Sequence, residues 1–386
     1  MFESCYDASL SGSTNETSFI LYSCIIVVYV EPCMCCLGFC LNLLAIGAFF
    51  TVIVAKRSRY CRRRTALTQY LMALCCFDAT QLMLSMLVIV IPAVQQYSVR
   101  LYQYDAVRKL TVFTVLIFYP LLMASNYASI WTMSAICMQR YLAVCYPLST
   151  LRSRFQIICN SKRTITLIVA VSLGLNLVRY GEMRWVIRRT NESVDVFIVM
   201  TDLRQNGPYV FLSDLIYVLL IYTFPFCLLT ALNVKILLTM RNHIQLKKSV
   251  NLVGRKNWNR RLREEHRSAV MILAVVVLFF VCRTLALVVR LLEGYILPHK
   301  QWEWYSQPGR LLHFCADLSN FMINVNSTVN PVLYFCFTRR FQDLFFEIRR
   351  SSRNNAIVRV GNSLMRRRRT KKNLVSSDPQ NRIELT

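Results

Sequence analysis

Seven long apolar runs alternate with shorter polar segments along the chain. The runs cover about residues 21–55, 66–95, 110–145, 163–183, 208–240, 264–293 and 309–336. A helix needs about 20 predominantly apolar residues to cross a bilayer, and each run reaches that length. The pattern therefore predicts an all-α membrane protein, with a seven-transmembrane helix bundle over residues 21–336.

Basic residues lie between the apolar runs and after the last of them. Lys and Arg crowd residues 56–64 and 241–263, and the tail has four consecutive arginines at 366–369. Positive charge gathers on the cytoplasmic side of membrane proteins, so we expect an extracellular N-terminus at residues 1–20. A net charge of +26 is also typical of nucleic-acid-binding proteins, but its placement beside the runs favours membrane lipids and predicts no nucleic-acid partner.

Apolar residues continue past the seventh run with a helical spacing. They follow an i, i+4, i+7, i+8, i+11 order, which places them on one face of a helix. These residues are Phe337, Phe341, Leu344, Phe345 and Ile348. Arginines flank the stretch, as in helices that lie on a membrane surface. We expect an amphipathic membrane-surface helix at residues 337–350 and a disordered basic cytoplasmic tail at residues 351–386.

Cysteine and asparagine signals add little chemistry. The chain has 16 cysteines, most of them inside apolar runs, where cysteine acts as a small hydrophobic residue. They predict no disulfide framework, and no Cys-x-x-Cys pair accompanies a His pair, so zinc is not expected. Asn15 and Asn191 begin Asn-x-Ser/Thr sequons, which we interpret as glycosylation sites outside the cell.

Polar residues inside the runs are the strongest functional signal, because an ionisable group in lipid needs a partner or water. The first run holds Asn42 as its polar residue at depth, the second holds Asp78, and the third ends near Arg140. Polar residues near the middle of three spans are expected to turn inward and hydrogen-bond to one another. We call this set the polar core: Asp78, Ser129, Asn326, Ser327 and Asn330.

Marker residues follow one another, each on its own run: Asn42, Asp78, Arg140, Pro225 and the string Asn330-Pro331-Val332-Leu333-Tyr334. In this order the chain resembles rhodopsin-like G-protein-coupled receptors over about residues 21–349. The resemblance implies a plasma-membrane receptor that signals through heterotrimeric G proteins and is not an enzyme. It also implies that the polar core holds a structural sodium ion at Asp78, with no other cofactor. A hydrogen-bonded cluster without an ion is the alternative.

The resemblance also implies an activation switch at the inner ends of the helices. Its residues are Arg140, Tyr141, Glu265, Pro331 and Tyr334. Gln139 stands before Arg140 where the family has an acid, so Glu265 on the sixth run becomes the expected partner of Arg140. Alternatively, Glu265 and its neighbour Glu264 only cap the positive N-terminal end of the sixth helix.

A narrower resemblance rests on strings where the general family has other residues. They are Tyr119-Pro120, residues 128–132, residues 176–182, residues 203–206 and Cys282-Arg283-Thr284-Leu285. They are similar to those of receptors for FMRFamide-related neuropeptides of invertebrates. This implies an extracellular peptide ligand ending in Arg-Phe-amide. A receptor for a different peptide or a small ligand is the alternative.

A ligand ending in Arg-Phe-amide needs an acid for its guanidinium and aromatic rings for its Phe. The candidate ligand-binding residues are Glu182, Glu293, Arg283, Asp317, Asn126, Trp185 and Tyr209. Glu182 and Glu293 lead because they belong to the narrower resemblance, although an acid there also fits a solvated loop charge or an internal pair with Arg179 or Arg290. Arg283 replaces the family's Trp and fits either a ligand contact or an internal clamp.

The family's bridge from the third helix to the second outer loop is missing. Val115 stands at one cysteine position, and residues 181–209 contain no cysteine. We therefore expect strand pairing and a contact between Arg179 and Glu182 to hold that loop.

Other protein classes lack their required residues here. Asn324 stands where an opsin has its lysine, and Leu122 stands where an amine receptor has an acid. A transporter is typically built from internal repeats and broken helices, and neither is visible. The four His are scattered, so no nucleophile and base can be grouped into an enzyme site.

Overall fold

The computed structural model describes residues 14–55, 62–97, 105–145, 160–189, 194–249, 255–292 and 307–337. These residues belong to one compact unit, which ends at Phe337. The expected surface helix beyond Phe337 and the expected tail lie outside the described residues.

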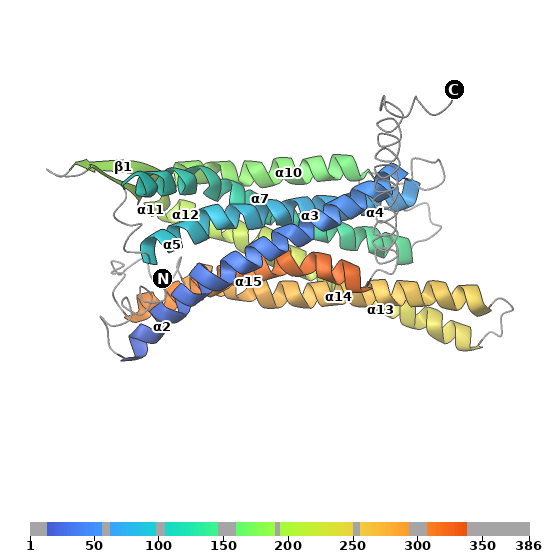
Figure 1. Ribbon diagram of the computed structural model, residues 1–386. Helices are drawn as coiled ribbons and strands as arrows, with labels where there is room; N and C mark the ends of the chain where they lie inside the picture. Colours follow the sequence, from blue (N-terminus) through green and yellow to red (C-terminus); the bar gives the residue numbers. More distant parts are fainter. Residues whose placement is uncertain are drawn as a thin grey trace, which may run out of the picture. The chain divides into compact units, whose positions relative to one another are not determined.

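Helices cross the unit in seven passes (Figure 1). In chain order they are α2 (Thr14–Cys24), η1 (Ile25–Val30) and α3 (Glu31–Ala55); α4 (Arg62–Ser85), η2 (Met86–Val90) and α5 (Ile91–Tyr97); α7 (Asp105–Cys145); α10 (Ser161–Leu177) and η3 (Val178–Gly181); α12 (Gly207–Ile216), η4 (Tyr217–Thr223) and α13 (Phe224–Ser249); α14 (Arg255–Leu291); and α15 (Gln307–Phe337). A hairpin of β1 (Met183–Arg189) and β2 (Val194–Met200), followed by α11 (Asp202–Gln205), lies between the fourth and fifth passes. The predicted all-α seven-helix bundle is confirmed.

The passes close into a ring around a shared interior. α3 contacts α4, α4 contacts α7, and α7 contacts both α10 and α13. α13 contacts α14, α14 contacts α15, and α15 returns to α3. Side chains on the inner faces of several passes can therefore meet inside the bundle.

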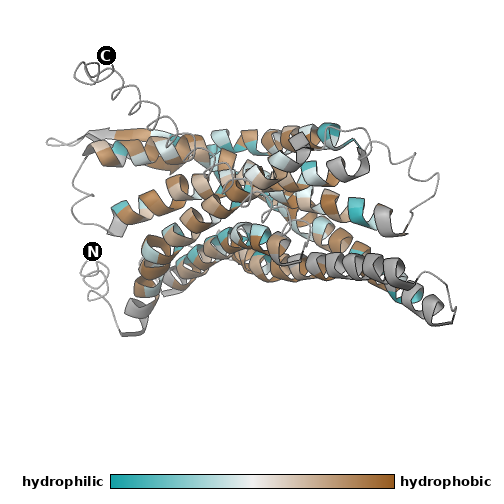
Figure 2. Ribbon diagram, turned by 45° about the vertical axis from the view of Figure 1, so that its right-hand side comes forward, coloured by the Kyte–Doolittle hydropathy of each residue, from teal (hydrophilic) through white to brown (hydrophobic). Residues whose placement is uncertain are grey.

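The bundle is apolar on its outside, as expected for a protein solvated by lipid. Leu44, Leu110 and Val281 are more than half exposed, and hydrophobic colouring covers most of the described helices (Figure 2). Within the described residues, five passes are long and apolar enough to cross a membrane. The other two helices, α14 and α15, have 37 and 31 residues. Both are longer than a membrane span, which needs about 20 residues.

Within the described residues, three passes contain a complete π-helical segment of five to seven residues, and each segment ends two positions before a proline. η1 precedes Pro32, η2 precedes Pro92 and η4 precedes Pro225. Proline has no N–H to donate, and its ring clashes with the carbonyl one turn earlier, so a wider turn relieves that clash. Glu31 and Ser85 adjoin η1 and η2, so these segments set where both side chains enter the bundle.

α3 and α15 approach each other closely at Gly38. A Cβ atom on Gly38 would clash with Thr328 and lie 2.8 Å from Leu82 Cδ1, so a side chain there would push the helices apart. Asn42 uses this approach, because its Nδ2 donates to Gly38 O at 2.9 Å and to Ser327 O at 3.1 Å. Asn42 therefore joins α3 to the helix that carries much of the polar core.

The hairpin confirms that strand pairing holds the loop after the fourth pass. β1 and β2 pair antiparallel, with Trp185 opposite Ile198. The N–H of Thr201 donates to Glu182 O at 2.9 Å, which ties the end of β2 to the end of the fourth pass. The expected contact between Arg179 and Glu182 forms as well.

Most described cysteines behave as small apolar residues. Cys35, Cys75, Cys137 and Cys282 are free and buried. Cys24 departs from this pattern, because it is disulfide-bonded.

Candidate functional site

Polar side chains gather inside the bundle in several clusters. We call the end near the hairpin and the start of α12 the hairpin end, and the opposite end, where α7 finishes at Cys145, the Arg140 end (Figure 1). The clusters are described from the hairpin end toward the Arg140 end.

The Arg179 cluster joins α7, the end of the fourth pass and α12. Arg179 is 5% exposed. Its Nε donates to Asn176 Oδ1 at 2.9 Å, and its Nη2 donates to Tyr127 OH at 3.3 Å. Arg179 Nη1 lies 3.8 Å from Glu182 Oε2, and Tyr209 OH donates to Glu182 Oε1 at 2.6 Å. One buried ion pair with its hydrogen bonds therefore links three passes.

Glu182 and Tyr209, two candidate ligand residues, thus contact each other directly. Both oxygens of Glu182 have partners within the protein. Trp185, a third candidate, is 48% exposed on β1, and its ring centroid lies 6.1 Å from that of Phe113 on α7. The structure brings Glu182 and Tyr209 together but leaves Trp185 half-exposed.

A second buried ion pair joins α12 to α14. Arg290 Nε donates to Asp214 Oδ1 at 2.9 Å, and Asp214 is buried. The Arg290 guanidinium also lies over Tyr217, 4.9 Å from the ring centroid, a cation–π contact. From the sequence, an acid at this end could be either a solvated charge or the partner of an internal arginine. Asp214 is the partner of Arg290.

The Glu31 cluster corrects the sequence analysis, which named Asn42 as the polar residue at depth in the first run. Glu31 lies in the same run and is fully buried. Asn324 Nδ2 donates to Glu31 Oε1 and to Ser85 Oγ, both at 2.7 Å, and Ser85 Oγ donates to the same Glu31 oxygen at 3.4 Å. The missed signal was an acid before Pro32 in an apolar stretch, since an ionisable residue at membrane depth indicates a functional site.

Asp317, another candidate ligand residue, lies on α15 and has partners within the protein. His313 Nδ1 is 3.0 Å from Asp317 Oδ2, and Ser23 Oγ donates to the same oxygen. Asp317 also interacts electrostatically with Glu31. The two acids therefore lie near each other between the first and seventh passes, with His313 beside Asp317.

The polar core lies where α4, α7 and α15 meet. Ser129 Oγ donates to Asp78 Oδ1 at 2.6 Å, and Asn330 Nδ2 donates to Asp78 Oδ2 at 2.8 Å. All five members are at most 1% exposed, so water does not reach them from the surface of the bundle.

Two amide oxygens of the polar core, Asn326 Oδ1 and Asn330 Oδ1, have no hydrogen-bond partner within the described residues, and Ser327 lies beside Asp78. With the Asp78 carboxylate they form the oxygen-donor set that hard cations prefer. The residues therefore fit a sodium ion, which would supply positive charge beside Asp78. Arg283 opposes such an ion, because it interacts electrostatically with Asp78 from α14.

Arg283 and Asn126 are buried candidate ligand residues with unused polar atoms. Arg283 is 2% exposed, and within the described residues none of its guanidinium nitrogens has a hydrogen-bond partner. Its guanidinium lies 5.8 Å from the ring centroid of Phe279. Asn126 is 5% exposed, and its Oδ1 also has no partner in that part of the chain. These groups can receive polar atoms of another molecule.

The candidate switch residues lie toward the Arg140 end on three helices. Arg140 and Tyr141 are half-buried on α7, and Pro331 is buried inside α15. Tyr141 packs beside Ile236 of α13, so this end of α7 contacts the fifth pass. Glu265 belongs to α14, and its role as partner of Arg140 stays a prediction.

Five candidate residues have side chains outside the described part of the chain. For Glu265, Tyr334 and Asn15 the structure describes the helical backbone but not the side chain. Glu293 and Asn191 are outside the described residues altogether. Their predicted roles in ligand binding, switching and glycosylation stay predictions.

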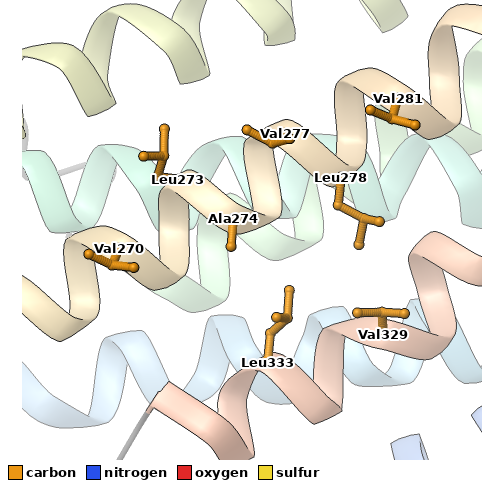
Figure 3. Close-up of a pocket in the computed structure, with 8 residues that line it drawn as sticks. All are labelled: Val270, Leu273, Ala274, Val277, Leu278, Val281, Val329 and Leu333. Atoms are coloured by element: carbon orange, nitrogen blue, oxygen red, sulfur yellow. The ribbon is translucent and has the colours of Figure 1, made fainter.

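An apolar groove of about 520 Å³ lies between α14 and α15 (Figure 3). Its lining residues are Val270, Leu273, Ala274, Val277, Leu278, Val281, Val329 and Leu333. All of them are aliphatic, so the groove offers no hydrogen bond or charge to a ligand. Lipid tails are as apolar as these side chains, and we assign the groove no part in ligand recognition.

Comparison with known proteins agrees with this arrangement. Residues 47–334 match the family described as 7 transmembrane receptor (rhodopsin family). The chain is 27% identical over 318 residues to an FMRFamide receptor of Drosophila melanogaster, covering 80% of this chain and 52% of that protein. It is 26% identical over 290 residues to an FMRFamide peptide receptor of Caenorhabditis elegans, covering 74% of this chain and 62% of that protein. The chain spans less than two thirds of the length of either relative.

Proposed function

Because the chain belongs to the rhodopsin family of seven-transmembrane receptors, we propose that it is a G-protein-coupled receptor for an extracellular neuropeptide ending in Arg-Phe-amide. Members of this family are multi-pass proteins of the plasma membrane and are receptors rather than enzymes. The similarity to two FMRFamide receptors over most of this chain supports a peptide of that class.

In this proposal the hairpin end faces the outside of the cell. The basic segments at residues 56–64 and 241–263 connect passes at the Arg140 end, where positive charge favours the cytoplasm. The sequons at Asn15 and Asn191 belong to the opposite end. A heterotrimeric G protein would then bind at Arg140, and the peptide would enter beside the hairpin.

The observation that carries the proposal is the set of buried polar atoms without partners inside the bundle. A peptide ending in Arg-Phe-amide brings carbonyl oxygens for Arg283 and N–H groups for Asn126 Oδ1, which have no partner within the described residues. Tyr127 and Tyr217, with ring centroids 6.4 Å apart, form a buried aromatic pair against which its Phe ring would pack on entering the bundle.

A panel of amidated peptides presented to cells that express the full chain tests the proposed function. We expect at least one peptide ending in Arg-Phe-amide to give a saturable calcium or cyclic AMP response that untransfected cells lack. Responses only to other peptides or to small molecules would favour the alternative, a rhodopsin-family receptor with a different ligand.

Removing an acid that binds the peptide is expected to weaken it strongly. A desolvated charge pair broken on one side costs about 2–5 kcal/mol, which exceeds a tenfold change in affinity. We therefore expect Glu182→Gln or Glu293→Gln to reduce the potency of an active peptide by more than tenfold. Concentration–response curves at matched surface expression measure this, with the exposed Asp202 changed to Asn as the control. Normal potency in both variants would exclude both acids.

We also propose that the polar core binds sodium in the resting receptor and that Arg283 weakens this binding. Because Arg283 interacts electrostatically with Asp78, removing its charge should strengthen sodium binding. Peptide affinity should fall when sodium replaces N-methylglucamine, more so in Arg283→Gln and not in Asp78→Asn. An equal sodium effect in Arg283→Gln and wild type would contradict the role of Arg283.

A further inference from the structure

We propose that Glu31 receives the guanidinium group of the peptide's arginine, in a subsite formed by the first, second and seventh passes. This inference rests on the proposed function and deepens it. It takes Glu31, rather than Glu182 or Glu293, as the acid for the guanidinium, so a large loss of potency in Glu182→Gln or Glu293→Gln with an unchanged Glu31→Gln receptor would contradict it. Glu31 was not among the candidate ligand-binding residues predicted from the sequence. The group that it would bind is a planar cation with several N–H donors.

The buried acids differ in whether a basic side chain accompanies them. Glu182 lies 3.8 Å from an arginine nitrogen, Asp214 lies 2.9 Å from another, and Asp317 lies 3.0 Å from a histidine. Within the described residues, Glu31 and Asp78 form no ion pair; their partners are Ser and Asn side chains. A buried carboxylate without a counter-charge is costly, so these two acids are the ones that an external cation would stabilise most.

Depth favours Glu31 over Asp78 as the acid that a peptide reaches. Ser85, which hydrogen-bonds to Glu31, lies about two helical turns beyond Asp78 along α4, or about 10 Å toward the hairpin end. The Asp78 carboxylate also has the Arg283 charge nearby, whereas Glu31 lies near a second acid, Asp317. A cation entering from the hairpin end therefore meets Glu31 before Asp78.

The Glu31 carboxyl is held in a fixed position with one oxygen available. Asn324 and Ser85 both donate to Oε1, so two other passes orient the group. Oε2 is buried and has no hydrogen-bond partner within the described residues. A guanidinium N–H donated to Oε2 would form a charge-assisted hydrogen bond, which is about twice as strong as a neutral one.

The backbone around this subsite is irregular in the way that functional sites often are. Glu31 directly follows η1, and Ser85 directly precedes η2. These two π-helical segments also contact each other across the first and second passes. Single π turns inside α-helices are frequent at functional sites, and here they place an acid and its hydroxyl partner opposite Asn324 of the seventh pass.

The test compares two peptides on the full chain in cells: Phe-Met-Arg-Phe-amide and its analogue with citrulline in place of arginine. Citrulline keeps the shape of arginine but has no charge. In the wild type we expect the arginine peptide to be more than tenfold more potent. In Glu31→Gln we expect most of this preference to disappear, because the arginine peptide loses potency while the citrulline peptide changes little. Cys36→Ser, an exposed position on the same helix, serves as the matched control.

The outcomes separate this inference from the proposed function. A wild type that responds to both peptides equally, or a Glu31→Gln receptor that keeps the full preference for arginine, overturns the subsite and leaves the peptide receptor standing. A wild type that responds to neither peptide nor to any other peptide ending in Arg-Phe-amide overturns both. If Glu31→Gln does not reach the surface, Glu31→Asp decides: a shortened carboxylate should lose part of the preference, and an unchanged preference contradicts the subsite.

Discussion

Arg179→Met is expected to remove most of the receptor from the cell surface. The change leaves the Glu182 carboxylate buried at 4% exposure without its arginine, and breaking a buried ion pair on one side costs about 3–5 kcal/mol. It also removes the hydrogen bonds to Asn176 and Tyr127. These contacts link the fourth pass to the third and fifth, so their loss should loosen the whole hairpin end.

Surface labelling relative to total expression measures this effect, and the unfolding temperature of the purified receptor measures its stability. Arg163→Met is the matched control, because Arg163 is exposed on α10 in the same pass. The double variant Arg179→Met/Glu182→Met should recover much of the loss, since replacing both members of a buried pair by apolar residues is often neutral. Normal surface level and unfolding temperature in Arg179→Met alone would show that the pair does not hold this end together.

Glu265→Ala is expected to raise ligand-free signalling, whereas Arg140→Ala should abolish signalling without abolishing peptide binding. In our proposal Glu265 pairs with Arg140 in the resting state, and the inner end of α14 moves outward on activation. An allosteric contact of this kind contributes about 1–3 kcal/mol. Its loss should raise a rare active population about five- to a hundredfold.

Basal cyclic AMP or calcium signalling at matched surface levels measures this change. Glu264→Ala is the natural control, because it removes the neighbouring acid from the same helix. The alternative in which the two acids cap the positive end of α14 is wrong, because this helix begins at Arg255 and has no acid in its first turn, and the dipole effect falls off within that turn. A Glu265→Ala receptor with wild-type basal activity would exclude the lock with Arg140.

The seven passes could be predicted because each has a signal that is local in sequence, whereas strand pairing was expected only because the bridge to that loop is missing. A span shows as a long apolar run, and clustered arginines mark its inner end. The pairing of Arg179 with Glu182 could also be anticipated, because the two residues lie three positions apart at a helix end. The π-helical segments could not be predicted from proline alone, because Pro120 and Pro331 lie inside helices without one.

The partners of the buried acids could not be predicted in the same way. Glu31 and Asn324 are far apart in sequence and meet only because α3 packs against α15. Asp214 has an arginine from α14, which no local pattern distinguishes from a solvated acid, whereas His313 and Asp317 lie four residues apart on one helix, a spacing that is local in sequence. The packing of the helices therefore determines which carboxylate has no internal basic partner and can bind a cationic ligand.

The central claim is that this bundle binds an extracellular peptide through its C-terminal Arg-Phe-amide. Equilibrium binding of fluorescent Phe-Met-Arg-Phe-amide to the purified full chain in lipid nanodiscs tests it most directly, with the free-acid form of the same peptide as competitor. We expect saturable binding that the unlabelled amide displaces and the free acid displaces far less, because the free acid lacks the C-terminal N–H donors that the amide offers to Asn126 Oδ1. An absence of saturable binding, or equal displacement by the amide and the acid, would contradict the claim.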